Sequence, residues 1–257
     1  MDAAAPAGPP LVRMEGVAKT FANGTVALDG LTLAIEAGSF TSILGPSGCG
    51  KSTALRLIAG LGEATSGTVR LASETARRDI GFVFQEPTLM PWASVFDNVF
   101  LPLRLAGRSR PEARKDVDRA LDLVGLAGFA DAYPRELSGG MRMRASIARA
   151  LVTGPRLLLM DEPFAALDEI TRFKLNDDLL ALWKREGWTV VFVTHSVFES
   201  VYLSNRILVM TPRPGRIAAD IAVDAPYPRG ETGFRTADAY NRHCREVSAR
   251  LAEAMGG

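Results

Sequence analysis

The sequence predicts an α/β fold: a mainly parallel sheet flanked by helices, with a small antiparallel β subdomain ahead of it and an α-helical subdomain inserted into it. Three observations predict this class. Short β-like runs between glycine turns occupy residues 11–40, apolar strand-like runs alternate with helical patterns in the rest of the chain, and the strand signal disappears between Gln85 and Pro155. Such alternation is typical of parallel sheets, because parallel strands need a crossover connection.

Composition describes an ordinary globular chain whose net charge identifies no partner. Its 257 residues are 47% hydrophobic, enough for one large core or two modest lobes. Thirty basic and 29 acidic residues give a net charge of +1, so no overall field attracts nucleic acid or an anionic membrane. No apolar stretch approaches the ~20 residues that a membrane helix needs, and the start MDAAAPAGPP lacks the basic and apolar regions of a signal peptide. If the protein serves a membrane, we expect it to do so from outside the bilayer.

Seven short runs are predicted as strands: residues 31–35, 40–44, 68–71, 80–84, 156–160, 189–194 and 206–210. The first belongs to the small N-terminal sheet, and the other six are expected in the parallel sheet, with a nucleotide at their carboxyl ends. The domain prediction is a flexible tail over residues 1–10, one domain over residues 11–225, and a short extension over residues 226–257 with one helix at about residues 237–253.

The inserted helical subdomain is expected from about residue 86 to residue 154. Ser109 and Glu112 have the spacing of a capping box, and apolar residues then recur at helical spacing up to Val124. A lobe of helices is therefore expected between two strands of the parallel sheet.

A glycine-rich loop between a predicted strand and a predicted helix has the pattern of a phosphate cradle. Residues 45–53 read GPSGCGKST, after the apolar run 40–44 and before the helical pattern 54–60. Glycines let the backbone N–H groups turn inward, a lysine adds a cation, a serine hydroxyl suits Mg²⁺, and the next helix directs its positive end to the same point. A purely structural glycine turn is the alternative, which the full pattern disfavours. The candidate phosphate-binding residues are Gly45, Pro46, Ser47, Gly48, Cys49, Gly50, Lys51, Ser52 and Thr53.

Cys49 lies inside this loop, beside a lysine and near a helix start. Because such surroundings favour the thiolate, we expect Cys49 to react with a maleimide faster than Cys244. The two cysteines have no metal-like spacing, and a cysteine within a phosphate loop fits a reducing compartment better than a disulfide. We therefore expect a cytoplasmic protein.

Two adjacent carboxylates follow the apolar run at residues 156–160. Because carboxylates at the end of a buried strand are costly unless they have a role, Asp161 is predicted to support Mg²⁺ and Glu162 to be the base that polarises an attacking water. The alternative is that the pair caps the next helix. Asp168 already has the position of an N-cap for the helix predicted at residues 170–185, which disfavours that alternative.

Two further polar residues follow predicted strands. His195 comes after the run 189–194 and Gln85 after the run 80–84, so both are expected at the carboxyl edge of the sheet, where a γ-phosphate contact is required. Taken alone, a histidine at a strand end is more often structural, and Gln85 would be an ordinary loop residue.

A second helix start, LSGGM at residues 137–141, also has exposed N–H groups and implies a second anion site. As a bare pattern it is weak, since many helices begin with serine and glycine. Two phosphate cradles in one chain nevertheless require an explanation.

Taken in order, GPSGCGKST, Gln85, LSGGM, LLLMDEP, residues 166–168 and His195 resemble the Walker A, Q-loop, signature, Walker B, D-loop and H-loop motifs of ABC transporter ATPase subunits. The resemblance covers residues 11–217 and implies a P-loop NTPase fold with a RecA-like core. It also implies ATP and Mg²⁺ as cofactors. In the implied site Phe21 stacks on adenine, Lys51 holds the phosphates, Ser52, Gln85 and Asp161 serve Mg²⁺, Asp168 belongs to the nucleotide site, and Glu162 and His195 join Lys51 as catalytic residues.

The resemblance also accounts for the second cradle. It implies that Ser138, Gly139 and Gly140 bind the γ-phosphate held by a second copy of the protein, so that two chains close over two ATP molecules. One chain would then contribute to two sites.

Several stretches, QEPTLMPWASVFDNV and DEPFAALDEITR among them, are similar to a narrower branch, the importer ATPases for nitrate, taurine and aliphatic sulfonates. This resemblance implies integral membrane permease subunits as partners, an extracytoplasmic solute-binding protein as an indirect partner, no nucleic acid, and a peripheral position on the cytoplasmic face of the bacterial plasma membrane. Met141 stands where glutamine is usual, and Ser196 where aspartate commonly follows the histidine, so the role of residue 141 stays open.

Other functions fit the sequence less well. DNA-repair and chromosome ATPases carry long coiled coils between the Walker motifs, whereas the segment between Lys51 and Asp161 has no sustained heptads. Translation-type relatives usually carry two cassettes, and a simple phosphotransferase leaves LSGGM unexplained. Within transport, the ATPase of an ABC exporter or lipid transporter is the alternative. The apolar cluster after Gln85 is either core or a permease docking site, and it consists of Leu89, Met90, Trp92, Val95 and Phe96.

Overall fold

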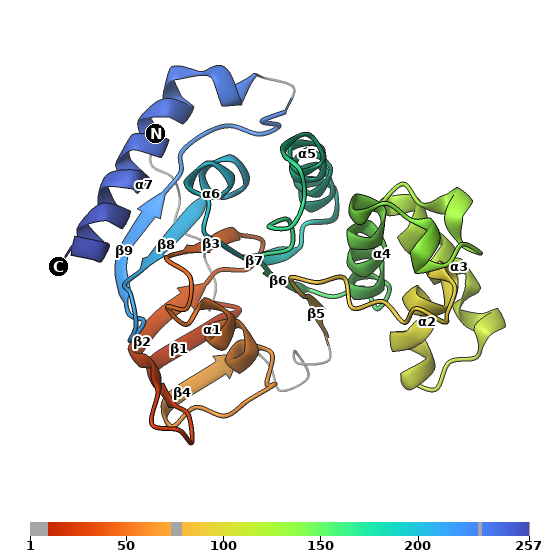
Figure 1. Cartoon of the computed structure of the whole chain (residues 1–257), viewed down its shortest axis with the longest axis horizontal. Coiled ribbons are helices and arrows are strands. Elements are labelled where there is room, and N and C mark those ends of the chain that lie inside the picture. The colour runs from red at the N-terminus through yellow and green to blue at the C-terminus, as the bar shows by residue number, and fades with distance from the viewer. Residues whose placement is uncertain (1–9, 73–78, 231–232, 257) are drawn as a thin grey trace.

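Two sheets and two groups of helices make up the protein in a computed structural model that describes residues 10–72, 79–230 and 233–256. The larger sheet has six strands in the order β5-β6-β7-β3-β8-β9 (Figure 1). The first five run parallel, and β9 is antiparallel to β8. Their bounds are β3 Phe40–Leu44, β5 Ile80–Val83, β6 Leu157–Asp161, β7 Thr189–Thr194, β8 Arg206–Met210 and β9 Ile217–Ala222.

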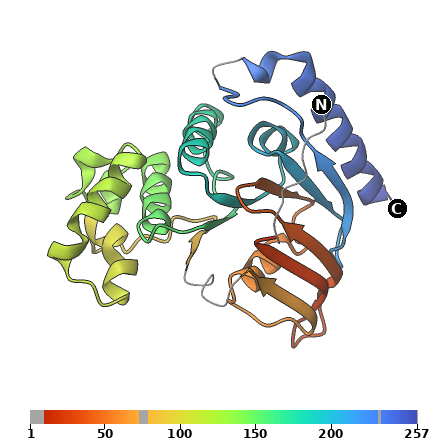
Figure 2. The same ribbon diagram turned by 180° about the vertical axis from the view of Figure 1, so that it is seen from behind.

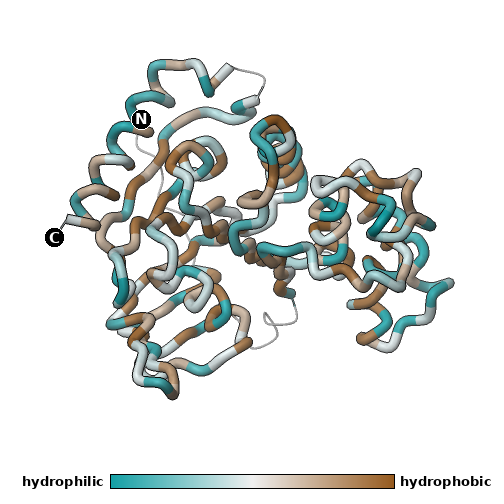
Figure 3. Tube along the Cα trace, in the orientation of Figure 1, coloured by the Kyte–Doolittle hydropathy of each residue, from teal (hydrophilic) through white to brown (hydrophobic). Residues whose placement is uncertain are grey.

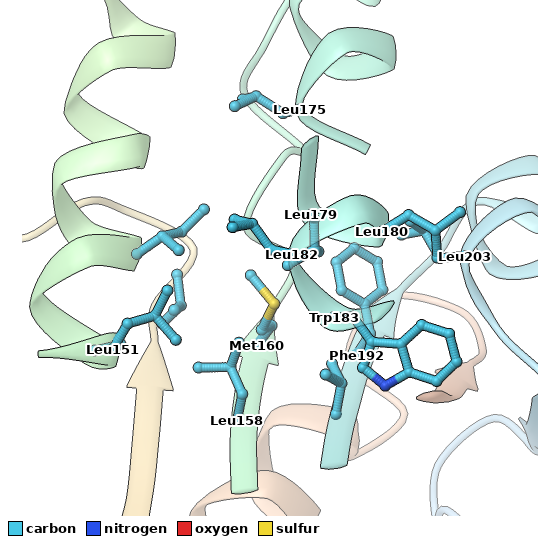
Figure 4. Packing of buried hydrophobic residues seen from close by; sticks show 14 of the residues in the cluster. Leu151, Leu158, Met160, Leu175, Leu179, Leu180, Leu182, Trp183, Phe192 and Leu203 are labelled. Carbon is cyan, nitrogen blue, oxygen red and sulfur yellow. The ribbon is translucent and has the colours of Figure 1, made fainter. Parts of the chain in front are cut away.

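The inner strands of this sheet are covered on both faces. Every residue of β6 and β7 is buried, which explains their near-continuous apolar sequences. Because side chains alternate between the faces of a strand, Met160 and Phe192 lie in one core, beside Trp183 of helix α5 (Glu169–Glu186; Figure 4), while Leu159 and Val193 lie in the other. Hydrophobic stretches of the chain accordingly gather along the central strands (Figure 3).

The helices divide between these two faces. α5, α6 and α7 lie on one side of the six-stranded sheet, whereas α1 lies on the other, between the two sheets (Figures 1 and 2). α7 packs against α6, β8 and β9, as expected for a packing helix at the end of the chain. The bounds are α1 Lys51–Ile58, α5 Glu169–Glu186, α6 Val197–Leu203, η4 Phe234–Thr236 and α7 Asp238–Gly256.

The small sheet is antiparallel and has the order β2-β1-β4, with β1 Val12–Thr20, β2 Val26–Ile35 and β4 Ser66–Leu71. The expectation that residues 68–71 join the parallel sheet is therefore wrong. Four of the six residues of β4 are exposed and the other two are half-buried, as expected for an edge strand of an antiparallel sheet that faces solvent on one side. It also lies so close to β1 that a Cβ at Gly67 would be 2.4 Å from the carbonyl oxygen of Gly16.

The helical lobe lies beside β5, which α4 contacts, and projects away from the rest of the molecule (Figures 1 and 2). The predicted capping box is confirmed: the Glu112 carboxylate accepts a hydrogen bond of 2.8 Å from the N–H of Ser109. The apolar cluster is divided, because Val95 and Phe96 are core residues whereas Trp92 is 77% exposed. The bounds are α2 Val95–Leu105, α3 Arg110–Leu123, η2 Ala127–Phe129, η3 Pro134–Glu136 and α4 Gly139–Leu151.

Other boundaries follow the predictions within a few residues. α1 begins at Lys51, three residues before the predicted helical pattern, and α5 begins directly after its predicted N-cap. The predicted tail at residues 1–10 falls outside the described residues, apart from Pro10. Within the described part of the chain, no helix combines the length and the apolar character needed to cross a membrane.

Candidate nucleotide-binding site

The loop from residue 45 to residue 50 joins β3 to α1, and its shape depends on glycine. Gly48 and Gly50 have φ of +75° and +109°, in the left-handed region that glycine adopts at little cost. At Gly45 a Cβ would lie 2.9 Å from the Sγ of Cys49. The backbone therefore curls tightly over the first turn of α1, as a phosphate cradle requires.

Lys51, the first residue of α1, folds back over this loop. Its side chain is almost fully buried, and Nζ donates hydrogen bonds to the carbonyls of Gly45 and Pro46, at 2.9 and 3.0 Å. Nζ is also 3.4 Å from Oε1 of Glu162. A buried ammonium needs such partners, because an unpaired buried charge is costly. The cation is thereby held on the concave side of the loop.

Ser52 and Asp161 meet across the sheet edge. The hydroxyl of Ser52 donates a 2.7 Å hydrogen bond to Oδ1 of Asp161, the last residue of β6. Burial raises the pKa of Asp161, and the hydrogen bond from Ser52 opposes that shift. A hydroxyl and a carboxylate side by side are hard oxygen ligands of the kind that Mg²⁺ prefers.

Glu162 lies between two other candidate residues. Oε1 faces Lys51, and Oε2 is 3.1 Å from Nδ1 of His195. β6 and β7 are parallel neighbours with Asp161 opposite Val193, so the residues that follow these strands meet at one edge. Glu162 has φ +46°, which is uncommon for a residue other than glycine and is found more often at functional sites than elsewhere.

Some of the other predicted site residues form no side-chain hydrogen bond with the residues above, in the part of the chain that the structure describes. Ser47 is exposed at the tip of the loop and Thr53 is half-buried in α1. Gln85 is exposed after β5, the strand next to β6, and no hydrogen bond of its side chain is found within the described residues. Phe21 is 45% exposed in the turn between β1 and β2, with Nζ of Lys19 5.6 Å from its ring centre.

Asp168 caps α5, as predicted. Its carboxylate accepts a 2.9 Å hydrogen bond from the N–H of Thr171, and this bond to the backbone lowers the pKa of Asp168. The same turn contacts the second candidate cradle, because a Cβ at Gly140 would lie 2.8 Å from Cγ2 of Thr171.

The second cradle is the start of α4, and it lies against the start of α5 rather than against the loop at residues 45–50. Ser138 is the N-cap, and its hydroxyl accepts a 3.2 Å hydrogen bond from the N–H of Met141. Gly139 and Gly140 occupy the first two helical positions, where N–H groups have no intrahelical acceptor. The donors for an anion are present, but no contact links them to Lys51 of the same chain within the described residues.

The expectation of a reactive thiolate at Cys49 is wrong. Its side chain is 1% exposed, and burial raises its pKa despite the opposing effect of Lys51. Burial raises the pKa of Cys244 as well. Sequence proximity to a lysine indicated the nearby charge correctly, but it could not reveal how closely the neighbouring strands cover the thiol.

Two arginines that the motifs did not single out contact the loops of this site. Arg213 donates to the carbonyl of Gly48, and Arg149 of α4 donates to the carbonyls of Pro87 and Thr88. Both contacts join segments that are far apart in the chain, so local patterns gave no signal for them.

Comparison with known proteins agrees with this arrangement. A family model described as ABC transporter matches residues 28–165. A putative ATP-binding protein of Brucella abortus is 50% identical over 211 residues, 81% of each chain. The taurine import ATP-binding protein TauB of Rhizobium johnstonii is 47% identical over 80% of each chain. The aliphatic sulfonates import ATP-binding protein SsuB of Bacillus licheniformis is 44% identical, over 83% of this chain and 85% of that protein.

Two solved structures share the fold. The ATP-binding cassette MJ0796, a dimer in a post-hydrolysis state bound to ADP and Pi, is 36% identical with a TM-score of 0.73, covering 84% of this chain and all of that chain. The cbiO1 protein of Clostridium perfringens, part of the ABC transporter complex cbiONQ, is 28% identical with a TM-score of 0.76, covering 96% of this chain and 97% of that one.

Proposed function

The chain belongs to the ABC transporter family of ATP-binding subunits, and we propose that it hydrolyses ATP to drive uptake of a small solute of the taurine, aliphatic sulfonate or nitrate kind through a separate permease. The observation that carries the proposal is the convergence of Lys51, Glu162 and His195 beside the glycine-rich loop. Similar proteins that are named import ATP-binding proteins favour an importer over an exporter or a lipid transporter.

The partners follow from the same family. The working form is a homodimer bound to a membrane permease, in keeping with the dimeric cassette of similar fold. We propose in addition that a solute-binding protein delivers the solute from the other side of the membrane, and that this chain lies on the cytoplasmic face of the plasma membrane. Residues 11–225 would form the ATPase domain, with the helical lobe inserted in it, and residues 226–257 its C-terminal extension.

The residues present fit ATP and Mg²⁺. The loop is closed so tightly that side chains at Gly45 or Gly50 would collide with Cys49 or with the carbonyl of Ala27, which leaves backbone N–H groups to line it. Ser52 and Asp161 offer adjacent oxygen ligands, and Gln85 follows the neighbouring strand. When bound, Mg²⁺ neutralises charge on the phosphates.

The chain's own residues then have separate tasks in hydrolysis. When ATP binds, Nζ of Lys51 would donate to phosphate oxygens instead of the carbonyls of Gly45 and Pro46, without a large movement of the side chain. Glu162 would accept a proton from the attacking water, and His195 orients the Glu162 carboxylate through their 3.1 Å contact. The exposed part of the His195 ring would contact the γ-phosphate. Phe21 is proposed to stack on the adenine, and Asp168 to position the loop that precedes α5.

A second chain completes each site. Ser138, Gly139 and Gly140 offer backbone and hydroxyl donors at a helix start that lies against α5 and has no contact with its own chain's phosphate loop within the described residues, so we assign them to the γ-phosphate held by the partner subunit. Each homodimer would then contain two shared sites, and turnover would require closure of the pair.

The test is the replacement Glu162→Gln, which removes the base but keeps a side chain of similar size. Turnover should fall by at least ~10²-fold, with nearly unchanged ATP affinity, because general-base catalysis is lost while the cradle stays intact. Steady-state hydrolysis and nucleotide binding are measured on the same preparation. Glu253→Gln on the exposed side of α7 is the matched control. Turnover by Glu162→Gln at the level of that control would exclude Glu162 as the base.

A further inference from the structure

The turn between β8 and β9, residues 211–216, is firmly built and lies against the phosphate loop. The N–H and hydroxyl of Thr211 bond within the turn, to the carbonyls of Arg216 and Pro214, both at 3.0 Å. Gly215 donates a 2.9 Å hydrogen bond to the carbonyl of Ala27 in β2. A Cβ at Gly215 would lie 2.3 Å from the carbonyl oxygen of Cys49, so the two backbones touch.

This turn presents one arginine to the phosphate loop. Nε and Nη2 of Arg213 lie 3.0 and 2.9 Å from the carbonyl oxygen of Gly48, so two N–H groups on one edge of the guanidinium donate to one acceptor. Gly48 is the loop residue with φ +75°. The side chain of Arg213 is otherwise exposed, and none of the sequence motifs includes it.

Holding that carbonyl fixes the direction of the next N–H group. In a trans peptide the C=O and the following N–H point in opposite directions. With the carbonyl of Gly48 held outward by Arg213, the N–H of Cys49 points to the concave side of the loop. It donates a long hydrogen bond of 3.4 Å to the carbonyl of Pro46, and Nζ of Lys51 donates to the same carbonyl.

We propose that Arg213 is a positioning residue of the nucleotide site: it clamps the Gly48–Cys49 peptide so that the N–H of Cys49 is presented to a nucleotide phosphate beside Lys51. The inference rests on the proposed function and deepens it. An N–H that already points inward needs no reorientation when the phosphate arrives, which is the energetic benefit of a preorganised donor. The guanidinium also offsets the partial negative charge of a carbonyl that lies close to an anion site.

The first measurement is the Kd for Mg-ATP and Mg-ADP of Arg213→Ala. The matched control is Arg216→Ala, which removes the same charge from the same turn but from a side chain that pairs with Asp29 and not with the loop. We expect both nucleotides to bind about five- to tenfold more weakly to Arg213→Ala, with kcat at saturating ATP within about twofold of the wild type. Arg213→Lys, which retains one donor, should recover part of the affinity.

The second measurement reports on the loop without nucleotide. Cys49 adjoins the clamped peptide and is buried, so loosening that peptide should expose its thiol. Maleimide labelling of Cys49 in Arg213→Ala, followed by mass spectrometry, should be several-fold faster than in the wild type. Cys244, a buried residue of α7 far from the phosphate loop in the sequence, serves as the internal reference, and its labelling should not change.

Three results would overturn the proposal. One is unchanged nucleotide affinity in Arg213→Ala, and another is unchanged labelling of Cys49. The third is an equal loss of affinity in Arg213→Ala and Arg216→Ala, because charge alone would then explain the effect. Failure of the wild-type chain to bind Mg-ATP would instead overturn the proposed function, and the labelling experiment would still decide whether Arg213 holds the loop.

Discussion

Arg149 fixes the segment that follows Gln85, and its replacement tests how the helical lobe is tied to the nucleotide site. Its guanidinium, on α4, donates to the carbonyl and hydroxyl of Thr88, both at 2.8 Å, and to the carbonyl of Pro87 at 2.9 Å. Thr88 has φ +47°, a conformation that residues other than glycine adopt only when the surrounding structure enforces it. Burial lowers the pKa of Arg149, so these bonds come from a partly desolvated cation.

The magnitude follows from these contacts. Hydrogen bonds from charged donors contribute about 1.5–3 kcal/mol when buried, but Thr88 is exposed, and water can replace part of what is lost in Arg149→Ala. We therefore expect a loss of about 2 kcal/mol of unfolding free energy, which corresponds to a fall in Tm of about 4–8 °C for a chain of this size. Turnover should fall about tenfold or more, because a displaced Gln85 would no longer meet the site.

The assay combines urea denaturation with steady-state hydrolysis, and Arg250→Ala, an exposed arginine on α7, is the control. A double-mutant cycle tests whether Arg149 stabilises the backbone conformation of Thr88. In a Thr88→Gly background the left-handed conformation needs no support, so Arg149→Ala should cost about 1 kcal/mol less there than in the wild type. The reasoning is refuted if Arg149→Ala is as stable as Arg250→Ala, or if the two substitutions are strictly additive.

Three further predictions concern other parts of the molecule. Gly139→Asp should abolish hydrolysis but leave ATP binding by the dilute chain intact, because a Cβ at residue 139 would lie no closer than 3.5 Å to its neighbours and the added charge repels only the γ-phosphate held by a partner. ATP binding as weak as that of Lys51→Ala would contradict a site shared by two chains. Burial raises the pKa of Glu199, so the folded state favours the protonated carboxyl and loses stability as the pH rises above the ordinary glutamate pKa. Glu199→Gln should therefore have a higher Tm than the wild type at pH 7, and this difference in Tm should become smaller towards pH 4. A difference in Tm that stays the same between pH 4 and pH 7 would contradict this explanation. Trp92→Ala should change unfolding free energy by no more than about 0.5 kcal/mol, because the ring is 77% exposed, yet reduce the stimulation of hydrolysis by the permease; full stimulation would exclude a docking role.

Local patterns predicted the elements that are buried on both faces and failed where burial was partial. The run 189–194 coincides with β7 because all of its residues are buried, so the apolar signal is uninterrupted. β9 was not predicted, because its sequence IAADIA consists mainly of alanine with one aspartate, residue types that are depleted in strands, although its burial alternates as in an antiparallel edge strand. The same weakness misplaced residues 68–71, which pair with β1 in the small sheet, and no local pattern records that long-range pairing.

For the site, the motifs placed Lys51, Ser52, Asp161, Glu162 and His195 close together because each follows a strand of one parallel sheet, or a loop that starts there. The motifs could not predict which of these groups form hydrogen bonds with one another or with the loop. The hydrogen bonds of Lys51 to the loop carbonyls depend on how the loop closes, which spacing alone does not specify.

Arg149 and Arg213 both hold a loop carbonyl in place, but the residues that they hold differ, and so should the effects of replacing the two arginines. Each donates to a carbonyl in a loop whose backbone is left-handed, at Thr88 and at Gly48. Glycine adopts that conformation unaided, so Arg213 has only to choose the direction of a peptide, and its loss should appear in nucleotide affinity rather than in stability. Threonine does not, so Arg149 must hold the conformation itself, and its loss should appear in unfolding free energy and turnover together. Since Arg149 lies on the helix that begins with the second cradle, a shift of that helix towards a partner's phosphate would act on the segment after Gln85 through the hydrogen bonds of Arg149.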